Sequence, residues 1–177
     1  MYFGESVAIY EDILLVGATG ANGISYGIGA VFQFDIPSGE QIRRMVYSEE
    51  VSFRFFGSRL AILGTTVIVG LENFPTRRKL SSNPTHEREV SSDATSDTLP
   101  VCVFNLDLSL PTTEIGRFNV SDAWTTDFLG YDVSTSNGKV LVGAPLMNSS
   151  GAAFVFSSDG ELLFTLTPAT ASIGDYF

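Results

Sequence analysis

The sequence has little of the residues that build several common kinds of site. It holds one cysteine, Cys102, and one histidine, His86, among 177 residues. A single cysteine excludes an internal disulfide framework and any cysteine-based metal cluster. Cys102 lies in an apolar run, so we expect a buried, unreactive thiol. His86 has no fixed nucleophile near it, so we expect no Ser-His-Asp arrangement. The 20 Asp and Glu residues leave carboxylate pairs open, but we assign no catalytic residue in this chain.

Long apolar runs and positive charge are also scarce. No apolar run approaches the ~20 residues that cross a bilayer, and the N-terminus lacks the basic and apolar segments of a signal peptide. We therefore expect no membrane insertion. Ten Lys and Arg residues stand against 20 Asp and Glu residues, a net charge of −10. Nucleic acids and anionic membranes repel such a chain, so we expect neither as a partner.

Glycine and phenylalanine are abundant instead. The chain has 17 glycines and 14 phenylalanines, and 44% of its residues are apolar. Short apolar runs between turn residues favour an all-β protein with many turns. We find no glycine motif that opens a nucleotide-binding helix, and we expect no cofactor.

The sequence also repeats itself three times. The first phrase begins with Phe3-Gly4 and returns with Phe56-Gly57 and Leu129-Gly130; a second phrase ends in Gly17, Gly70 and Gly143. The offsets agree, because both phrases recur after 53 positions (57 − 4 and 70 − 17) and then after 73 (130 − 57 and 143 − 70). Two landmarks with equal offsets predict a repeat architecture. We place the repeats at about 3–55, 56–128 and 129–177.

Each repeat divides into four short strand-like runs. Asn137-Gly138 predicts a type I′ hairpin turn between the first two runs of the third repeat. Four antiparallel strands per repeat are typical of a propeller blade. The expected strands are 7–9, 13–16, 30–34 and 42–47; then 60–63, 67–69, 101–105 and 115–120; and finally 133–136, 140–142, 152–156 and 162–167.

The longer second interval locates an insertion within the second repeat. Residues 73–98 are rich in Ser, Thr, Pro and charge and lack apolar periodicity. We expect an exposed loop there, which either is a tolerated insertion or binds a partner.

These phrases resemble the FG-GAP repeat of integrin α-subunit propellers and of many secreted or surface proteins. Gly17-Ala18-Thr19 and Gly143-Ala144-Pro145 match its second phrase, whereas Leu129 replaces the usual Phe and Gly70-Leu71-Glu72 departs from Gly-Ala-Pro. The resemblance implies a β-propeller that serves extracellular recognition or adhesion. It also implies a location outside the cell or at its surface. Some such repeats bind Ca²⁺ between their first two strands, but the three connections here lack the spaced carboxylates, so we expect no metal.

The repeated residues are expected to have structural roles. The glycines fit positions of close backbone approach, and the repeated Phe residues would pack between adjacent sheets. On this reasoning Gly143→Val should destabilise the fold. Three further residues are candidates for other roles: Trp124 for a contact if it is exposed, and Asn119 and Asn148 for glycosylation, because each begins an acceptor triplet.

We therefore expect an all-β β-propeller fragment of about three four-stranded antiparallel blades. Closed propellers typically have four to eight blades, so we expect the remaining blades of a longer chain, or a self-associated copy, to complete it. The main functional hypothesis is a non-catalytic module that binds a protein or glycan through the loops between blades. One alternative is the accessory propeller of a secreted hydrolase whose catalytic domain lies elsewhere, and another is a purely structural scaffold.

Overall fold

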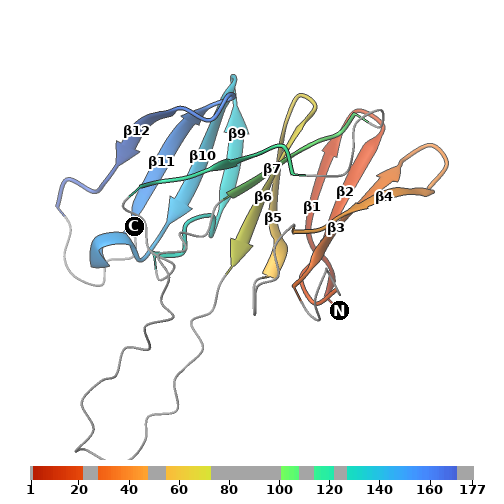
Figure 1. The fold of residues 1–177 in the computed structure, drawn as a ribbon, viewed down its shortest axis with the longest axis horizontal. Coiled ribbons are helices and arrows are strands. Elements are labelled where there is room, and N and C mark those ends of the chain that lie inside the picture. Colours follow the sequence, from red (N-terminus) through yellow and green to blue (C-terminus); the bar gives the residue numbers. More distant parts are fainter. Residues whose placement is uncertain are drawn as a thin grey trace, which may run out of the picture.

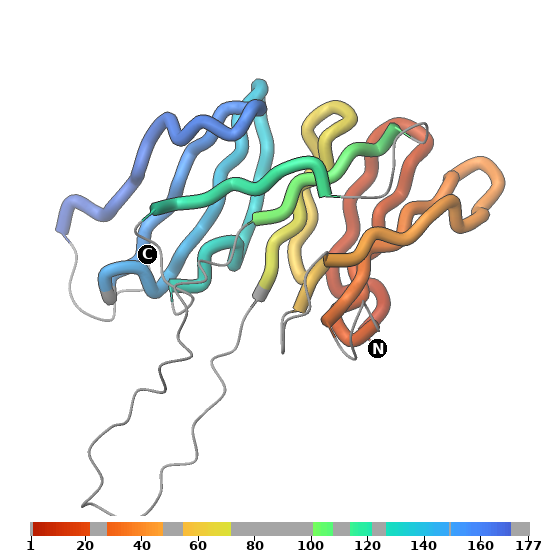
Figure 2. The backbone as a smooth tube through the Cα atoms, viewed as in Figure 1, coloured from red at the N-terminus to blue at the C-terminus, as the bar shows by residue number. Residues whose placement is uncertain are grey.

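The computed structural model describes residues 2–21, 28–47, 55–72, 101–107, 114–121 and 127–170. These residues form three four-stranded antiparallel sheets, which lie side by side as blades 1 to 3 (Figure 1). The chain trace shows blade 2 between the other two (Figure 2). A short 3-10 turn, η2, spans Met147–Ser149, and no described helix is long and apolar enough to span a membrane.

The strands follow one another in chain order within each blade. Blade 1 contains β1 (Phe3–Tyr10), β2 (Ile13–Ala18), β3 (Ala30–Asp35) and β4 (Gln41–Met45). Blade 2 contains β5 (Phe55–Leu63), β6 (Thr66–Glu72), β7 (Val101–Asn105) and β8 (Gly116–Phe118). Blade 3 contains β9 (Val133–Ser136), β10 (Lys139–Ala144), β11 (Ala152–Ser157) and β12 (Leu162–Leu166).

All twelve expected strands are present, and the all-β fold class is confirmed. The main difference is that β1 and β5 begin earlier than expected, within the Phe-Gly phrases. Phe3 pairs with Ala18 and Phe56 with Leu71, but the register shifts directly afterwards. Gly4 and Gly57 adopt φ of +91° and +88°, which glycine accepts without steric cost. The irregularity breaks the alternation of side chains, so the periodic pattern alone did not reveal these first residues of the strands.

Tight turns connect the first two strands of each blade. Tyr10 pairs with Ile13, Leu63 with Thr66 and Ser136 with Lys139, which leaves two residues in each turn. In the third turn Asn137 and Gly138 have φ of +48° and +72°. Positive φ at both positions is the mark of a type I′ turn, as the sequence predicted.

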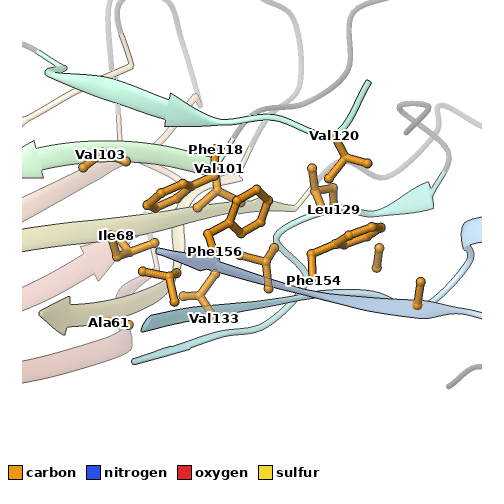
Figure 3. Packing of buried hydrophobic residues seen from close by; sticks show 14 of the residues in the cluster. Ala61, Ile68, Val101, Val103, Phe118, Val120, Leu129, Val133, Phe154 and Phe156 are labelled. Atoms are coloured by element: carbon orange, nitrogen blue, oxygen red, sulfur yellow. The ribbon is translucent and has the colours of Figure 1, made fainter. Parts of the chain in front are cut away.

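The hydrophobic core lies between the sheets rather than inside any one of them. Along β6, Val67 and Val69 pack into the cluster shared with blade 1, whereas Ile68 packs into the cluster shared with blade 3. Figure 3 shows this second cluster, in which Phe118 and Phe156 lie with ring centroids 5.0 Å apart. Blade 2 therefore buries both of its faces, because alternate side chains of a strand point to opposite sides of the sheet.

Polar contacts also join the blades. Thr135 Oγ1 in blade 3 donates a hydrogen bond to the carbonyl of Ile62 in blade 2, at 2.6 Å. Arg43 of β4 donates from Nη2 to the carbonyl of Asn105 at 2.5 Å and from Nη1 to that of Asp107 at 3.3 Å. Partial burial lowers the pKa of Arg43 and Asp107 opposes that shift. The guanidinium thus stabilises the boundary between blades 1 and 2 at the outer strands. Cys102 is fully buried in the same boundary, as expected.

Candidate functional site

The repeated phrases meet along one edge of the three sheets, which we call the Phe-Gly edge. Strands β1 and β5 begin there, and β2, β6 and β10 end there, so the loops that follow these three strands also start at this edge (Figure 1). The two-residue hairpins lie at the opposite edge. The repeat residues of the Phe-Gly edge are Phe3, Gly4, Gly17, Phe56, Gly57, Gly70, Leu129, Gly130, Gly143 and Pro145.

The aromatic position of the first phrase differs in burial between the blades. Phe56 is completely buried and its ring packs against Tyr47 and Phe104, with centroids 6.3 and 5.6 Å away. Leu129, at the same position of blade 3, is 2% exposed. Phe3 is 51% exposed, although its ring contacts Phe32 within its own blade. The expected packing between sheets therefore holds where a preceding blade is present in the structure.

The glycines of the second phrase bring neighbouring blades into close contact. A Cβ on Gly17 would clash with the carbonyl oxygen of Gly57 in blade 2, and a Cβ on Gly70 would clash with that of Gly130 in blade 3. Both positions therefore need glycine. A Cβ on Gly143 would meet nothing closer than the carbonyl oxygen of Asp132, at 3.7 Å. The expectation that Gly143→Val destabilises the fold stays a prediction, because the described contacts of Gly143 are with Asp132 of its own blade and not with a neighbouring blade.

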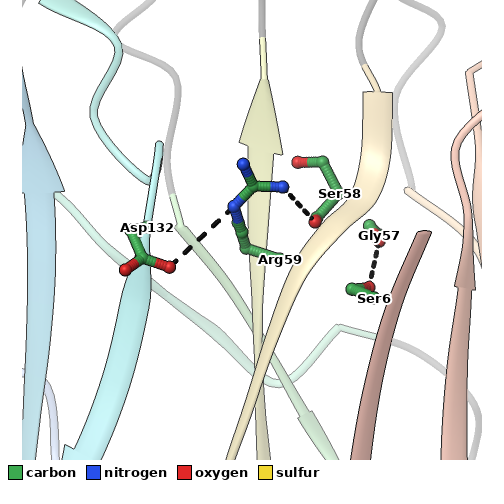
Figure 4. A network of polar contacts seen from close by, with 5 residues as sticks. All are labelled: Ser6, Gly57, Ser58, Arg59 and Asp132. Carbon is green, nitrogen blue, oxygen red and sulfur yellow. Dashed lines mark hydrogen bonds and ion pairs between the residues drawn. The ribbon is translucent and has the colours of Figure 1, made fainter.

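A polar network crosses the blade boundaries at the Phe-Gly edge (Figure 4). Ser6 Oγ donates to the carbonyl of Gly57 at 2.6 Å. Arg59 Nη1 donates to the carbonyl of Ser58 at 2.8 Å, and its Nε lies 3.9 Å from a carboxylate oxygen of Asp132 in blade 3. In the aligned phrases Ser6, Arg59 and Asp132 occupy the same fourth position. Ser6 and Arg59 therefore both reach toward the next blade in the chain, and Asp132 is contacted by the arginine of the preceding blade.

Arg59 also contacts an aromatic ring of blade 3. Its guanidinium carbon lies 5.6 Å from the centre of the Tyr131 ring, which is cation–π distance. Tyr131 remains 42% exposed, and the Asp132 side chain is 77% exposed. The ion pair to Asp132 is solvent-screened and adds little to stability. The result is an accessible group of one cation, one ring and one anion held on two blades.

Buried polar residues also lie at the Phe-Gly edge. Thr19 is almost fully buried and its hydroxyl donates to the carboxylate of Glu5. Ser58 is fully buried, and its hydroxyl has no hydrogen-bond partner among the described residues.

In the hairpin between β3 and β4, at the opposite edge, hydrogen bonds from Ser38 lower the pKa of Asp35. These contacts order the turns and loops but do not form a catalytic constellation.

Metal-binding residues do not gather in the part of the chain that the structure describes. No three His, Cys, Asp or Glu side chains there lie close enough to hold an ion. The hairpin between β1 and β2 offers Glu11 and Asp12 in a two-residue turn, which is too short for a loop of several spaced oxygen ligands. Absence of metal from these hairpins stays a prediction for direct titration.

The structure brings some candidate residues to the surface and leaves others undescribed. Asn119 and Asn148 are both exposed, and Asn148 has φ of +53°. Pro145 is half-buried. Trp124, His86 and the insertion at 73–98 lie outside the described residues. Sequence reasoning overlooked Arg59 and Tyr131; aligning the variable positions after each Phe-Gly phrase is the signal that could have found them.

Comparison with known families gives an independent assignment for one segment. Residues 112–156 match the family model described as the FG-GAP repeat. This segment of the chain is similar to the FG-GAP repeat. The matched segment runs from just before β8 to β11 and includes the Leu129-Gly130 and Gly143-Ala144-Pro145 phrases. The resemblance inferred from the FG-GAP phrases is therefore confirmed there, even though Leu129 replaces Phe in that repeat.

Solved structures with β-propeller folds resemble the whole arrangement. A chain of the mitotic checkpoint complex matches with a TM-score of 0.54 and 12% identity, over 93% of this chain and 37% of that one. Hydrazine synthase from Kuenenia stuttgartiensis matches with a TM-score of 0.54 and 13% identity, over 95% and 36%. A europium-containing methanol dehydrogenase matches with a TM-score of 0.55 and 9% identity, over 93% and 25%.

These likenesses establish the fold alone, because the identities are low. The chain spans at most 37% of the length of these three structures. A search of curated proteins found no match.

Proposed function

We propose that this chain is a non-catalytic propeller module that binds a protein or glycan partner at the Phe-Gly edge. The observation that carries the proposal is the exposed group formed by Arg59, Tyr131 and Asp132. Tyrosine and arginine are enriched among residues that dominate binding energy at interfaces. The ring and the guanidinium hold each other in place. Binding would therefore cost little side-chain entropy for these two residues.

The position of this group in the fold supports the same proposal. It lies where the blades meet, at the edge from which the loops after β2, β6 and β10 start. Loops placed on a rigid sheet scaffold are common sites of recognition. Asp132 accepts hydrogen bonds, Arg59 donates them, and the Tyr131 ring offers an apolar face that suits either a peptide or a sugar ring.

A location outside the cell or at its surface belongs to this proposal. Asn119 and Asn148 begin glycosylation acceptor triplets, and both are exposed. An acceptor asparagine has to be exposed for modification in a secreted protein. Peptide mapping of protein from its native source tests this part, because unmodified Asn119 and Asn148 would remove the support that they give.

The binding experiment uses the wild-type chain against an array of defined glycans and a panel of purified extracellular proteins. Tyr131→Ala and Arg59→Ala are each expected to weaken any specific binding at least tenfold, since hot-spot residues contribute ~2 kcal/mol or more. Ile36→Ala is the matched control, because Ile36 is 45% exposed and its amide donates to Asp12 at the opposite edge. Binding that survives both edge substitutions, or is lost equally in the control, would reject the proposed surface.

A further inference from the structure

The two outer faces of the blade array expose apolar side chains. The equivalent side chains are buried where blade 2 meets blades 1 and 3. The outer face of blade 1, which we call the N-face, presents Phe3, Val7 and Ile9 at 51%, 63% and 67% exposure. The outer face of blade 3, the C-face, presents Leu141, Phe164 and Leu166 at 41%, 59% and 45% exposure. Large exposed apolar residues that are contiguous on a sheet usually mark an interaction surface.

The N-face corresponds to a surface that blades 2 and 3 bury. Strand pairing places Val7 opposite Val16, Leu60 opposite Val69 and Val133 opposite Val142, so these three first-strand residues are equivalent. Leu60 packs into the boundary with blade 1, and Val133 is only 7% exposed in the boundary with blade 2. The N-face is therefore the half of a blade boundary that receives a preceding blade.

The C-face is the complementary half of the same boundary. Leu141 is equivalent to Leu15 and Ile68, which are both completely buried against the following blade. Leu166 pairs with Ala153 as Met45 pairs with Val31, and Met45 is 1% exposed. Among the described residues this boundary is thus made twice, and the N-face and the C-face each expose one half of it.

The glycine contacts show the same complementarity. Gly57 lies so close to blade 1 that an added Cβ would be 2.9 Å from the carbonyl oxygen of Ala30. Gly130 is similarly close to Val101 of blade 2, at 3.0 Å. Gly4 has the same positive φ but nothing within 4 Å, and Gly143 has no clash on the side where Gly17 and Gly70 meet the next blade. A blade boundary would bring a glycine like Gly143 against a glycine like Gly4.

We propose that the C-face of one copy of this chain docks head to tail onto the N-face of a second copy, continuing the boundary that joins blades 1, 2 and 3. Such a contact is heterologous, because it joins two different surfaces of identical chains. It would bury Val7 and Leu141 and place Gly143 against Gly4. Asp132 has the same place in blade 3 that Ser6 has in blade 1, and Ser6 contacts Gly57 of the following blade. Asp132 would therefore come close to Glu5 and Ser6 of the second copy.

Charge gives the proposed contact a defined salt dependence. Each copy carries a net charge of −10, and the proposed contact would place Asp132 near Glu5, so the two copies repel each other at low ionic strength. Salt screens this repulsion without weakening the apolar contact. Association should therefore become stronger as salt is raised.

The experiment measures the mass of the full chain by light scattering over a range of concentrations and at two ionic strengths. Wild type and the control Ile36→Arg are expected to exceed the monomer mass as concentration rises, and more so at high salt. Val7→Arg and Leu141→Arg should each remain monomeric. An equimolar mixture of these two variants should reach twice the monomer mass, because it retains one intact N-face and one intact C-face.

Several outcomes would overturn the proposal. The first is a wild-type chain that stays monomeric at all concentrations. The second is association that Val7→Arg or Leu141→Arg alone retains. The third is association that becomes weaker as the salt concentration is raised. Circular dichroism of each variant establishes that it is folded, and Ile9→Arg replaces Val7→Arg if the latter unfolds. None of these substitutions changes Arg59, Tyr131 or Asp132, so a failure of this test is distinguishable from a failure of the proposed binding at the Phe-Gly edge.

Discussion

Ser6 reaches from blade 1 to the backbone of blade 2, where its hydroxyl donates to the carbonyl oxygen of Gly57 at 2.6 Å. This contact lies at the point where the two glycine phrases of adjacent blades meet, since a Cβ on Gly17 would clash with that same carbonyl. The carbonyl of Gly57 thus lies where the two blades come closest, and Ser6 provides its hydrogen-bond donor.

Ser6→Ala is expected to lower the free energy of unfolding by about 0.5–1.5 kcal/mol, the usual contribution of one hydrogen bond. The matched control is Ser134→Ala, because Ser134 is an exposed serine in the first strand of blade 3. Urea denaturation followed by circular dichroism measures both variants. Equal effects of the two substitutions would mean that the bond across the blades adds nothing.

The repeat glycines should respond unequally to alanine. Gly17→Ala is expected to cost about 1–3 kcal/mol or more, because the added methyl group would overlap the backbone of blade 2. In the monomeric chain at low concentration, Gly143→Ala should be neutral or stabilise by up to about 1 kcal/mol, because the site has room and alanine restricts the unfolded chain. Thermal and urea unfolding of the pair provide the comparison. A similar loss of stability in both variants would show that Gly143 has a neighbour that the structure does not describe.

The type I′ turn makes a separate prediction at Gly138. Its φ of +72° is costly for any residue with a Cβ, so Gly138→Ala should lower stability by about 1–2 kcal/mol. Gly116 in β8 is the control, since an added Cβ there meets nothing within 4 Å and its φ is not in the left-handed region. A shift of the urea midpoint for Gly138→Ala, with little change for Gly116→Ala, is the expected result. Equal midpoints would contradict the turn assignment.

Much of the fold could be predicted because it depends on local patterns. Alternating apolar residues placed the strands, and Asn137-Gly138 fixed a turn whose two residues both need positive φ. The exposed group of Arg59 and Tyr131 could not be predicted in this way. Its two members lie in different repeats and meet only because blade 2 packs against blade 3.

The sequence by itself determined the repeat, its four strands and its glycine positions, because these follow from spacing and backbone conformation within one blade. The tertiary structure decided which equivalent residues are buried. Phe3 and Phe56 have the same place in the repeated phrase, yet they are 51% and 0% exposed. The physical reason is that a blade buries a face only against another blade, so burial depends on a neighbour that the residue's own repeat does not contain.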